Sequence, residues 1–193
     1  MPKLLFACLL TLAVARPSAL QAADWPDPES AWLKSPDGYL WPDNTSTLEL
    51  LKVPTAELDA QLEGALIPSL ESTVTPPSLL AAWVELEDGG DRSLLYVDPA
   101  LSGTGGKYIY VMTRTDGEWS WIGEMLCRRV LVGAPKPGGW RDLTCIGQRG
   151  LQYQRVLYTL RDGRYCAARN ELHDLERGVV ELTAAECAPP TDP

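Results

Sequence analysis

The chain has 193 residues, a formal net charge of -9 and an apolar content of 45%, which is enough for one domain with a hydrophobic core. The acidic balance disfavours binding to nucleic acid or to anionic lipid, because both select for basic surfaces. It favours solubility or a cationic partner.

Residues 1–22 are typical of a cleavable signal peptide. Lys3 gives a positive start, and the apolar run 4–15 is too short to span a bilayer. We expect cleavage after Ala22 and a periplasmic or secreted protein without a membrane segment. Cys8 lies inside the apolar run rather than after it, which argues against a lipid anchor. The signal contains two basic and no acidic residues, so the mature formal charge would be -11.

An N-terminal region over 23–78 is expected to contain an extended segment and one helix. Residues 23–46 are rich in Pro, Asp and Trp and lack periodicity, so we expect an extended lead-in whose tryptophans pack on the body. Thr55 is predicted to cap a helix that ends at Pro68. The helix is predicted by three leucines at helical spacing. They are Leu58, Leu62 and Leu66.

From residue 79 to 193 the sequence has the pattern of β-hairpins. Apolar, β-branched or aromatic runs come in pairs, and Asp116–Gly117 and Asp162–Gly163 are turn dipeptides that accept positive φ. The fold class is therefore predicted as mainly β: an antiparallel hairpin meander, as a sandwich or a partial propeller, with one N-terminal amphipathic helix. The paired runs are 80–86 with 93–97, 108–114 with 119–122, and 155–161 with 165–168.

Four cysteines would remain after signal cleavage. An even number in an exported domain is typical of disulfides, with three possible connectivities. Zinc binding is the weaker alternative, since His173 is the sole histidine and no C-x-x-C pair is present. The four are Cys127, Cys145, Cys166 and Cys187.

The positions of two cysteines predict one pairing. Residues 119–132 and 140–146 are each predicted to form a strand, and the turn between them is centred on Lys136. Cys127 and Cys145 each lie nine residues from that centre, so a simple hairpin would place their Cα atoms about 4.5–5.5 Å apart. We predict Cys127–Cys145 and, by remainder, Cys166–Cys187.

No sequence motif indicates a catalytic site. Ser102–Lys107 (SGTGGK) lacks the full phosphate-loop spacing and precedes a strand rather than a helix. His173 next to Asp174 has no serine nucleophile in a recognisable pattern. We therefore predict that the protein is not an enzyme and has no cofactor.

The segment Val84–Val97 (VELEDGGDRSLLYV) resembles the D-x-N-x-D-G-x-x-E loops between strands of FG-GAP and related β-propeller-like proteins, in which alternate carboxylates hold calcium. Glu85 and Glu87 match the first and third ligand positions, whereas Gly89 and Ser93 replace the fifth and the distal ligand. Calcium binding by this loop is left open, and no metal is predicted. Residues 139–143 and 156–165 also resemble repeated units of that group. The resemblance implies a β architecture but no activity.

As a class, small acidic exported β domains with disulfides resemble periplasmic lysozyme inhibitors and type VI secretion immunity proteins. The resemblance implies a protein partner, namely a cationic cell-wall hydrolase or effector, and leaves the oligomeric state open. Opposite charge would speed the encounter, and a loop inserted into the active cleft would supply specificity. The candidate binding residues are Ser102, Gly103, Thr104, Gly105 and Lys107 in one loop, and Lys136 and Trp140 in the loop 133–140.

Two alternatives stay open. The first is an exported carbohydrate-active hydrolase or glycan-binding domain, with tryptophans that stack on sugars and a carboxylate pair such as Glu118 and Glu124. The second is a structural role in the envelope. The tryptophans of the first alternative are Trp119, Trp121 and Trp140.

Overall fold

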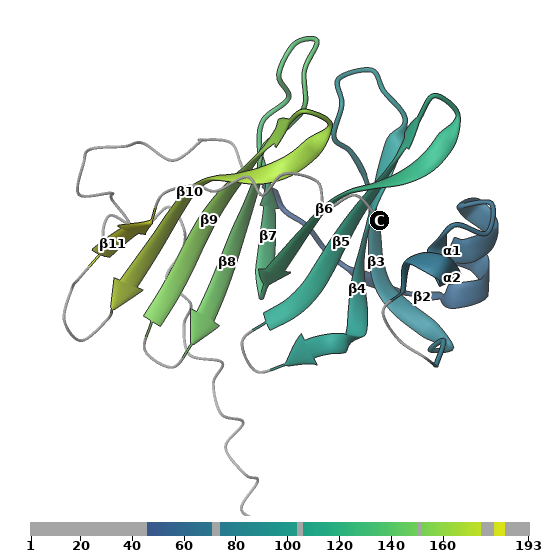
Figure 1. Ribbon diagram of the computed structural model, residues 1–193, viewed down its shortest axis with the longest axis horizontal. Helices are drawn as coiled ribbons and strands as arrows, with labels where there is room; N and C mark the ends of the chain where they lie inside the picture. Colours follow the sequence, from purple (N-terminus) through teal and green to yellow (C-terminus); the bar gives the residue numbers. More distant parts are fainter. Residues whose placement is uncertain (1–45, 71–73, 104–105, 150–151, 175–179, 184–193) are drawn as a thin grey trace, which may run out of the picture. The chain divides into compact units, whose positions relative to one another are not determined.

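The computed structural model describes residues 46–70, 74–103, 106–149, 152–174 and 180–183 (Figure 1). All of them belong to Lys34–Pro193, one of the two units into which the chain divides. Within these residues, eleven strands form two antiparallel sheets, accompanied by two short helical segments, so the prediction of a mainly β fold is confirmed. The predicted signal peptide, the lead-in up to residue 45, Thr104, Gly105 and Cys187 lie outside the described residues.

The first sheet has five strands within the described residues, in the order β2-β3-β4-β5-β6. Its strands are consecutive in sequence, as expected for a meander of hairpins. The strands are β2(Leu51–Pro54), β3(Ser78–Glu85), β4(Arg92–Gly103), β5(Gly106–Thr115) and β6(Glu118–Cys127).

The second sheet has six strands within the same residues, in the order β1-β7-β8-β9-β10-β11. The described part of the chain thus begins in this sheet, leaves it for the five-stranded sheet, and returns. Residues 46–54, where β1 and β2 lie, were not predicted to form strands. The strands are β1(Ser46–Thr47), β7(Arg129–Val132), β8(Leu143–Arg149), β9(Gln152–Arg161), β10(Arg164–Asp174) and β11(Val180–Thr183).

The main hydrophobic core lies between the inner faces of the two sheets, as in a sandwich. Residues from β4, β5 and β6 pack with residues from β7 to β10 in one cluster. The residues of this cluster occupy alternate positions along each strand, because every second side chain points to the same face. The fully or nearly fully buried members include Leu95, Val111, Met125, Val130, Leu143 and Val156.

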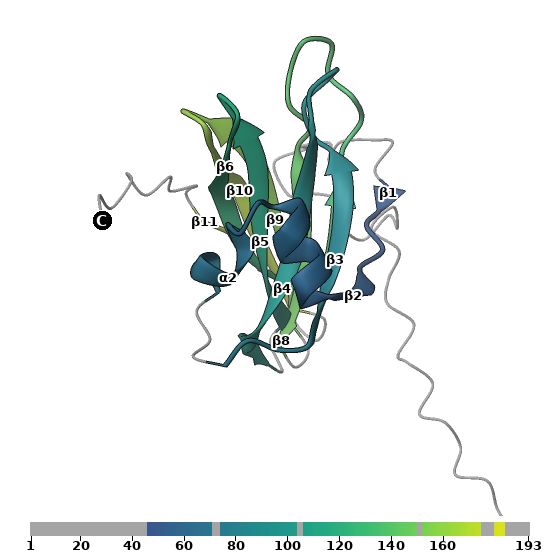
Figure 2. The same cartoon turned by 90° about the vertical axis from the view of Figure 1, so that its right-hand side faces the viewer.

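The helical segments α1(Thr55–Gln61) and α2(Leu66–Ser69) cover the outer face of the five-stranded sheet (Figure 2). The three leucines of the predicted helix, Leu58, Leu62 and Leu66, are completely buried there. The single continuous helix that we predicted is wrong, since Glu63 and Gly64 have φ of 54° and 84° and separate α1 from α2. The predicted cap is also wrong: the N-cap residue is Pro54, and the Thr55 hydroxyl donates to the Pro76 carbonyl oxygen (2.6 Å).

The predicted hairpins are present. Asp116 and Asp162 have φ of 53° and 49°, and the glycines that follow them have φ of 86° and 76°. Two successive positive φ angles are what a tight two-residue turn between antiparallel strands requires. These turns join β5 to β6 and β9 to β10.

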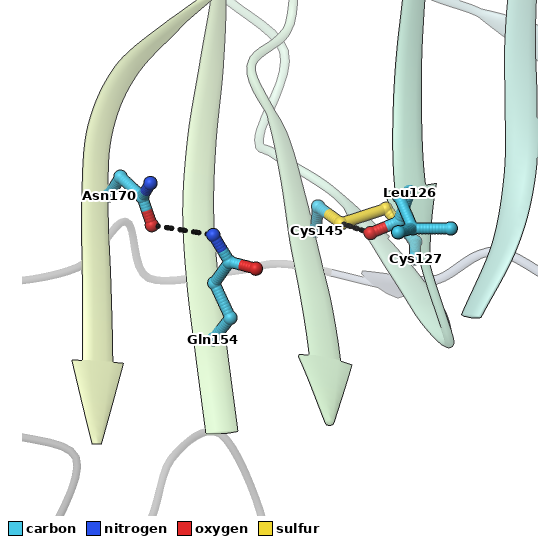
Figure 3. Close-up of a disulfide and its surroundings, with 5 residues drawn as sticks. All are labelled: Leu126, Cys127, Cys145, Gln154 and Asn170. Carbon is cyan, nitrogen blue, oxygen red and sulfur yellow. Dashed lines mark hydrogen bonds between the residues drawn. A yellow bond between two sulfur atoms is a disulfide. The ribbon is translucent and has the colours of Figure 1, made fainter. Parts of the chain in front are cut away.

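The Cys127–Cys145 disulfide is present, but the geometry predicted for it is wrong. Residues 119–132 do not form one strand: β6 ends at Cys127, and β7 begins at Arg129 in the other sheet. In the β7–β8 hairpin, Val130 rather than Cys127 lies opposite Cys145. The disulfide therefore joins the two sheets, with a Cα–Cα distance of 5.4 Å (Figure 3). Cys166 is also disulfide-bonded.

Candidate functional site

Two connecting loops, one from each sheet, meet at the same end of the sheets. The β3–β4 loop, 86–91, and the β7–β8 loop, 133–142, extend beyond the strands together (Figure 1). Glu87 and Trp140 form an isolated antiparallel bridge. We call these two segments the loop pair.

Hydrogen bonds hold the loop pair together on both sides of that bridge. The Asp88 amide donates to the Gly139 carbonyl oxygen (3.0 Å), and the Arg141 amide donates to the Leu86 carbonyl oxygen (2.7 Å). The Gly138 amide donates to Asp88 Oδ2 (2.9 Å). The first segment belongs to the stretch that resembles a calcium loop. The second was predicted as a loop that inserts into the active cleft of a partner. The structure brings the two together.

The base of the loop pair is anchored in the sandwich. The Tyr165 hydroxyl on β10 donates to the Arg141 carbonyl oxygen (2.7 Å), and the rings of Trp140 and Tyr165 meet edge to face at 6.3 Å. Burial, with the nearby charge of Asp142, raises the pKa of the Tyr165 phenol, so this hydroxyl keeps its proton and remains a donor. Leu86 is completely buried beneath the loops.

Lys136 and Trp140, predicted as partner anchors, have different environments. Lys136 lies at the exposed turn of its loop and pairs through Nζ with Asp142 Oδ1 (2.7 Å). Trp140 is half-buried and packs on the main core. Trp140 thus acts as a support of the loop pair, whereas Lys136 is accessible.

The described residues of the other predicted loop, 102–103 and 106–107, lie at the opposite end of β4 (Figure 1). The Ser102 hydroxyl donates to the Asp98 carbonyl oxygen (2.7 Å) and accepts from the Tyr108 amide (3.2 Å). Gly103 and Gly106 pair directly, and Lys107 lies on β5 opposite Cys127. The two predicted loops therefore belong to opposite ends of the sandwich and do not form one binding surface.

The tryptophans of the carbohydrate alternative do not form one platform. Trp119 and Trp121 lie on the outer face of the five-stranded sheet, since they stand opposite Arg114 and Met112 of β5. Trp140 belongs instead to the core between the sheets. The Arg164 guanidinium lies over the Trp121 ring, 4.9 Å from its centroid. Glu118 and Glu124 are both exposed on β6.

Within the residues that the structure describes, no three His, Cys, Asp or Glu side chains are grouped closely enough to hold a metal ion. Among these described residues, Glu85 and Glu87 of the loop that resembles a calcium site belong to no such group. In that described part, no helix is both long and apolar enough to cross a membrane.

A buried charged cluster that was not predicted lies on the outer face of the six-stranded sheet. Glu171 is 0% exposed and His173 is 3% exposed. Glu171 pairs with Arg169 Nε at 2.7 Å and with His173 Nε2 at 3.1 Å, and it stands opposite Arg155 on β9. The charged residues at alternate positions 169, 171 and 173 would ordinarily indicate a solvent-facing strand surface, which is why the pattern gave no signal of burial.

The comparisons with known proteins identify no relative. No family model matches the chain, and no match was found among curated proteins or solved structures.

Proposed function

We propose that this chain is an exported protein-binding module that inhibits or neutralises a cell-wall-degrading enzyme or a secreted effector. The loop pair carries the proposal. Its two segments come from different sheets and are held together by a backbone bridge and by the Asp88 side chain. A loop that is ordered before binding loses less conformational entropy in the complex.

The charge of the loop pair favours a cationic target. Glu87, Asp88 and Asp91 are exposed on the β3–β4 segment, whereas Lys136 on the other segment is already paired with Asp142. The whole chain carries a formal charge of -9. Opposite charge on the target would raise the association rate at low ionic strength.

The disulfide supports export to an oxidising compartment such as the periplasm. Cys127 and Cys145 are bonded across the two sheets, and such bonds form and persist where thiols are not kept reduced. Export would place the protein where wall-degrading enzymes act.

The proposal is tested by inhibition. Oxidised protein is immobilised, envelope extract is passed over it at low and at moderate salt, and each captured enzyme is then assayed for clearing of a peptidoglycan suspension. We expect one cationic hydrolase to be retained mainly at low salt and to be inhibited in the clearing assay. Capture without inhibition, or no retained enzyme, would count against the proposal.

Two matched variants test whether inhibition depends on the loop pair. Asp88→Ala removes one charge and the acceptor of the Gly138 amide, and we expect it to weaken inhibition about tenfold. Glu57→Ala removes one exposed acidic group from α1 and should change inhibition less than about twofold. Equal effects of the two variants would show that only net charge matters.

A glycan-binding role is the second candidate, and partly exposed Trp121 is the observation that favours it. Aromatic rings can stack on sugars, but one face of this ring is covered by Arg164. Binding of peptidoglycan fragments that survives high salt and is lost in Trp121→Ala would support this role over the first.

A further inference from the structure

A second surface, on the outer face at the β6 edge of the five-stranded sheet, combines aromatic, apolar and acidic side chains. Tyr108 stands opposite Leu126. Glu124 precedes Leu126 by two residues on β6 and therefore lies on the same face. Trp121 is 37% exposed and Leu126 is 44% exposed. We call Tyr108, Trp121, Glu124 and Leu126 the β6 patch.

A β-bulge creates this arrangement. Trp121 and Glu124 are three residues apart, so in a regular strand they would point to opposite faces. The register shift between Val111 and Met112 leaves Ile122 without a partner on β5, and Ile122 points into the main core. Both Trp121 and Glu124 consequently lie on the outer face.

The carboxylate of Glu124 is exposed and has no ion-pair partner among the described residues. Arg164 is the nearby cation, and its guanidinium stacks on the Trp121 ring. Burial and, to a lesser extent, the charges of Glu124 and Tyr108 raise the pKa of the Tyr158 phenol to about 12. The Tyr158 phenol therefore remains protonated and supplies no charge that could pair with Glu124.

We propose that the β6 patch binds a lysine or arginine side chain of the protein partner. The methylene stem of such a side chain would lie on Tyr108 and Leu126, and its charged head would reach the Glu124 carboxylate. Trp, Tyr and Arg are the residues that most often dominate the energetics of protein interfaces. The β6 patch contains Trp121 and Tyr108, and Arg164 stacks on Trp121. This inference rests on the proposed function, because it specifies the partner's chemistry at a second surface.

Other occupants fit the β6 patch less well. A second copy of the chain would bring two strongly acidic proteins together and two Glu124 carboxylates near each other. A sugar ring would have to stack on Trp121, whose face already holds Arg164. A basic side chain, by contrast, would neutralise the charge of Glu124.

The proposal is tested by nuclear magnetic resonance titration with N-acetyl-lysine methylamide as the probe. We expect saturable shifts of the Trp121 indole N–H and the Leu126 amide, with a dissociation constant on the order of millimolar. The neutral probe N-acetyl-norleucine methylamide should give no saturable shift. Glu124→Gln should weaken binding of the lysine probe about threefold, whereas Glu118→Gln on the same strand should leave it unchanged. Equal binding of both probes, or no effect of Glu124→Gln, would overturn the proposal.

The same variants separate this proposal from the proposed function. In the complex with a captured hydrolase, Glu124→Gln should weaken inhibition at least about tenfold, because the pair would there be desolvated. Unchanged inhibition by Glu124→Gln would overturn the β6 patch and leave the proposed function standing. If no hydrolase is captured, the proposed function fails, and the probe titration still decides the chemistry of the patch.

Discussion

The outer face of the five-stranded sheet is buried by apolar and aromatic contacts, whereas the outer face of the six-stranded sheet buries charged side chains beside apolar ones. On the first face, leucines of α1 and α2 pack on Tyr96, Tyr110 and Met112. On the second face, Glu171 and His173 are buried and paired. Apolar burial stabilises in proportion to the area removed from water. Buried charge is tolerated only where each charge has a partner. The two faces should therefore respond differently to substitution.

The largest effect is expected on the charged face. Glu171→Gln removes the negative charge that pairs with Arg169 and His173 and faces Arg155. Loss of one member of a buried ionic cluster costs about 3–5 kcal/mol, so we expect a decrease of that size in the free energy of unfolding in urea at pH 7. The exposed Glu85→Gln serves as the control. A decrease below about 1 kcal/mol for Glu171→Gln would show that the charges on this face are effectively solvated.

On the apolar face, Leu62→Ala should cost about 3 kcal/mol. Leu62 is completely buried under the helical segments, and its truncation loses both transfer free energy and packing. Leu51→Ala on β2 is the matched control, because Leu51 is exposed and should change stability by less than about 0.5 kcal/mol. The same urea measurement compares the two. A cost of Leu62→Ala no larger than that of Leu51→Ala would contradict the burial of this face by apolar contacts.

Titration at alkaline pH tests the environment of Tyr158, which packs on the core between the sheets. Neither Glu171→Gln nor Leu62→Ala changes this region. Burial first, and then the charge of Glu124, raises the pKa of Tyr158 from 10.0 to about 12. The unfolded chain loses this phenolic proton first as pH rises, so the stabilisation is complete below pH 10 and disappears by about pH 12. The total is about 3 kcal/mol. Tyr158→Phe cannot ionise and should flatten the decline in unfolding free energy between these pH values. Tyr165 has a raised pKa as well, so part of the decline should persist, and an unchanged slope in Tyr158→Phe would contradict the assignment.

Local conformational preference decides which features of the fold could be predicted from the sequence. The Asp-Gly turns carry their own conformational preference, so the hairpins around Asp116 and Asp162 were predicted correctly. The passage of the chain from one sheet to the other at Arg128 has no local signature, because residues on either side have the same strand pattern. The Cys127–Cys145 pairing was consequently right while its hairpin geometry was wrong.

For the candidate site, the sequence indicated individual loops but not their association. Glycine and proline content marked 133–140 as a loop, and acidic spacing marked 85–93. Contact between Glu87 and Trp140 depends on how the two sheets pack, which no residue pattern records. The β6 patch was missed for a different reason, because the bulge at Ile122 changes the face of every residue after it.

The smallest expected effect tests a polar contact within the apolar face. The hydroxyls of Tyr96 and Ser69 lie 2.8 Å apart, and Tyr96 is completely buried. Tyr96→Phe should lower the free energy of unfolding by about 1 kcal/mol, the usual net value of a neutral hydrogen bond. Ser69→Ala also removes the hydrogen bond that its hydroxyl donates to the Leu66 carbonyl oxygen (2.6 Å), so the single variants alone are ambiguous. A double-mutant cycle isolates the pair, and we expect a coupling energy of about 0.5–1 kcal/mol. Zero coupling would mean that this hydrogen bond adds nothing to the stabilisation that packing gives Tyr96.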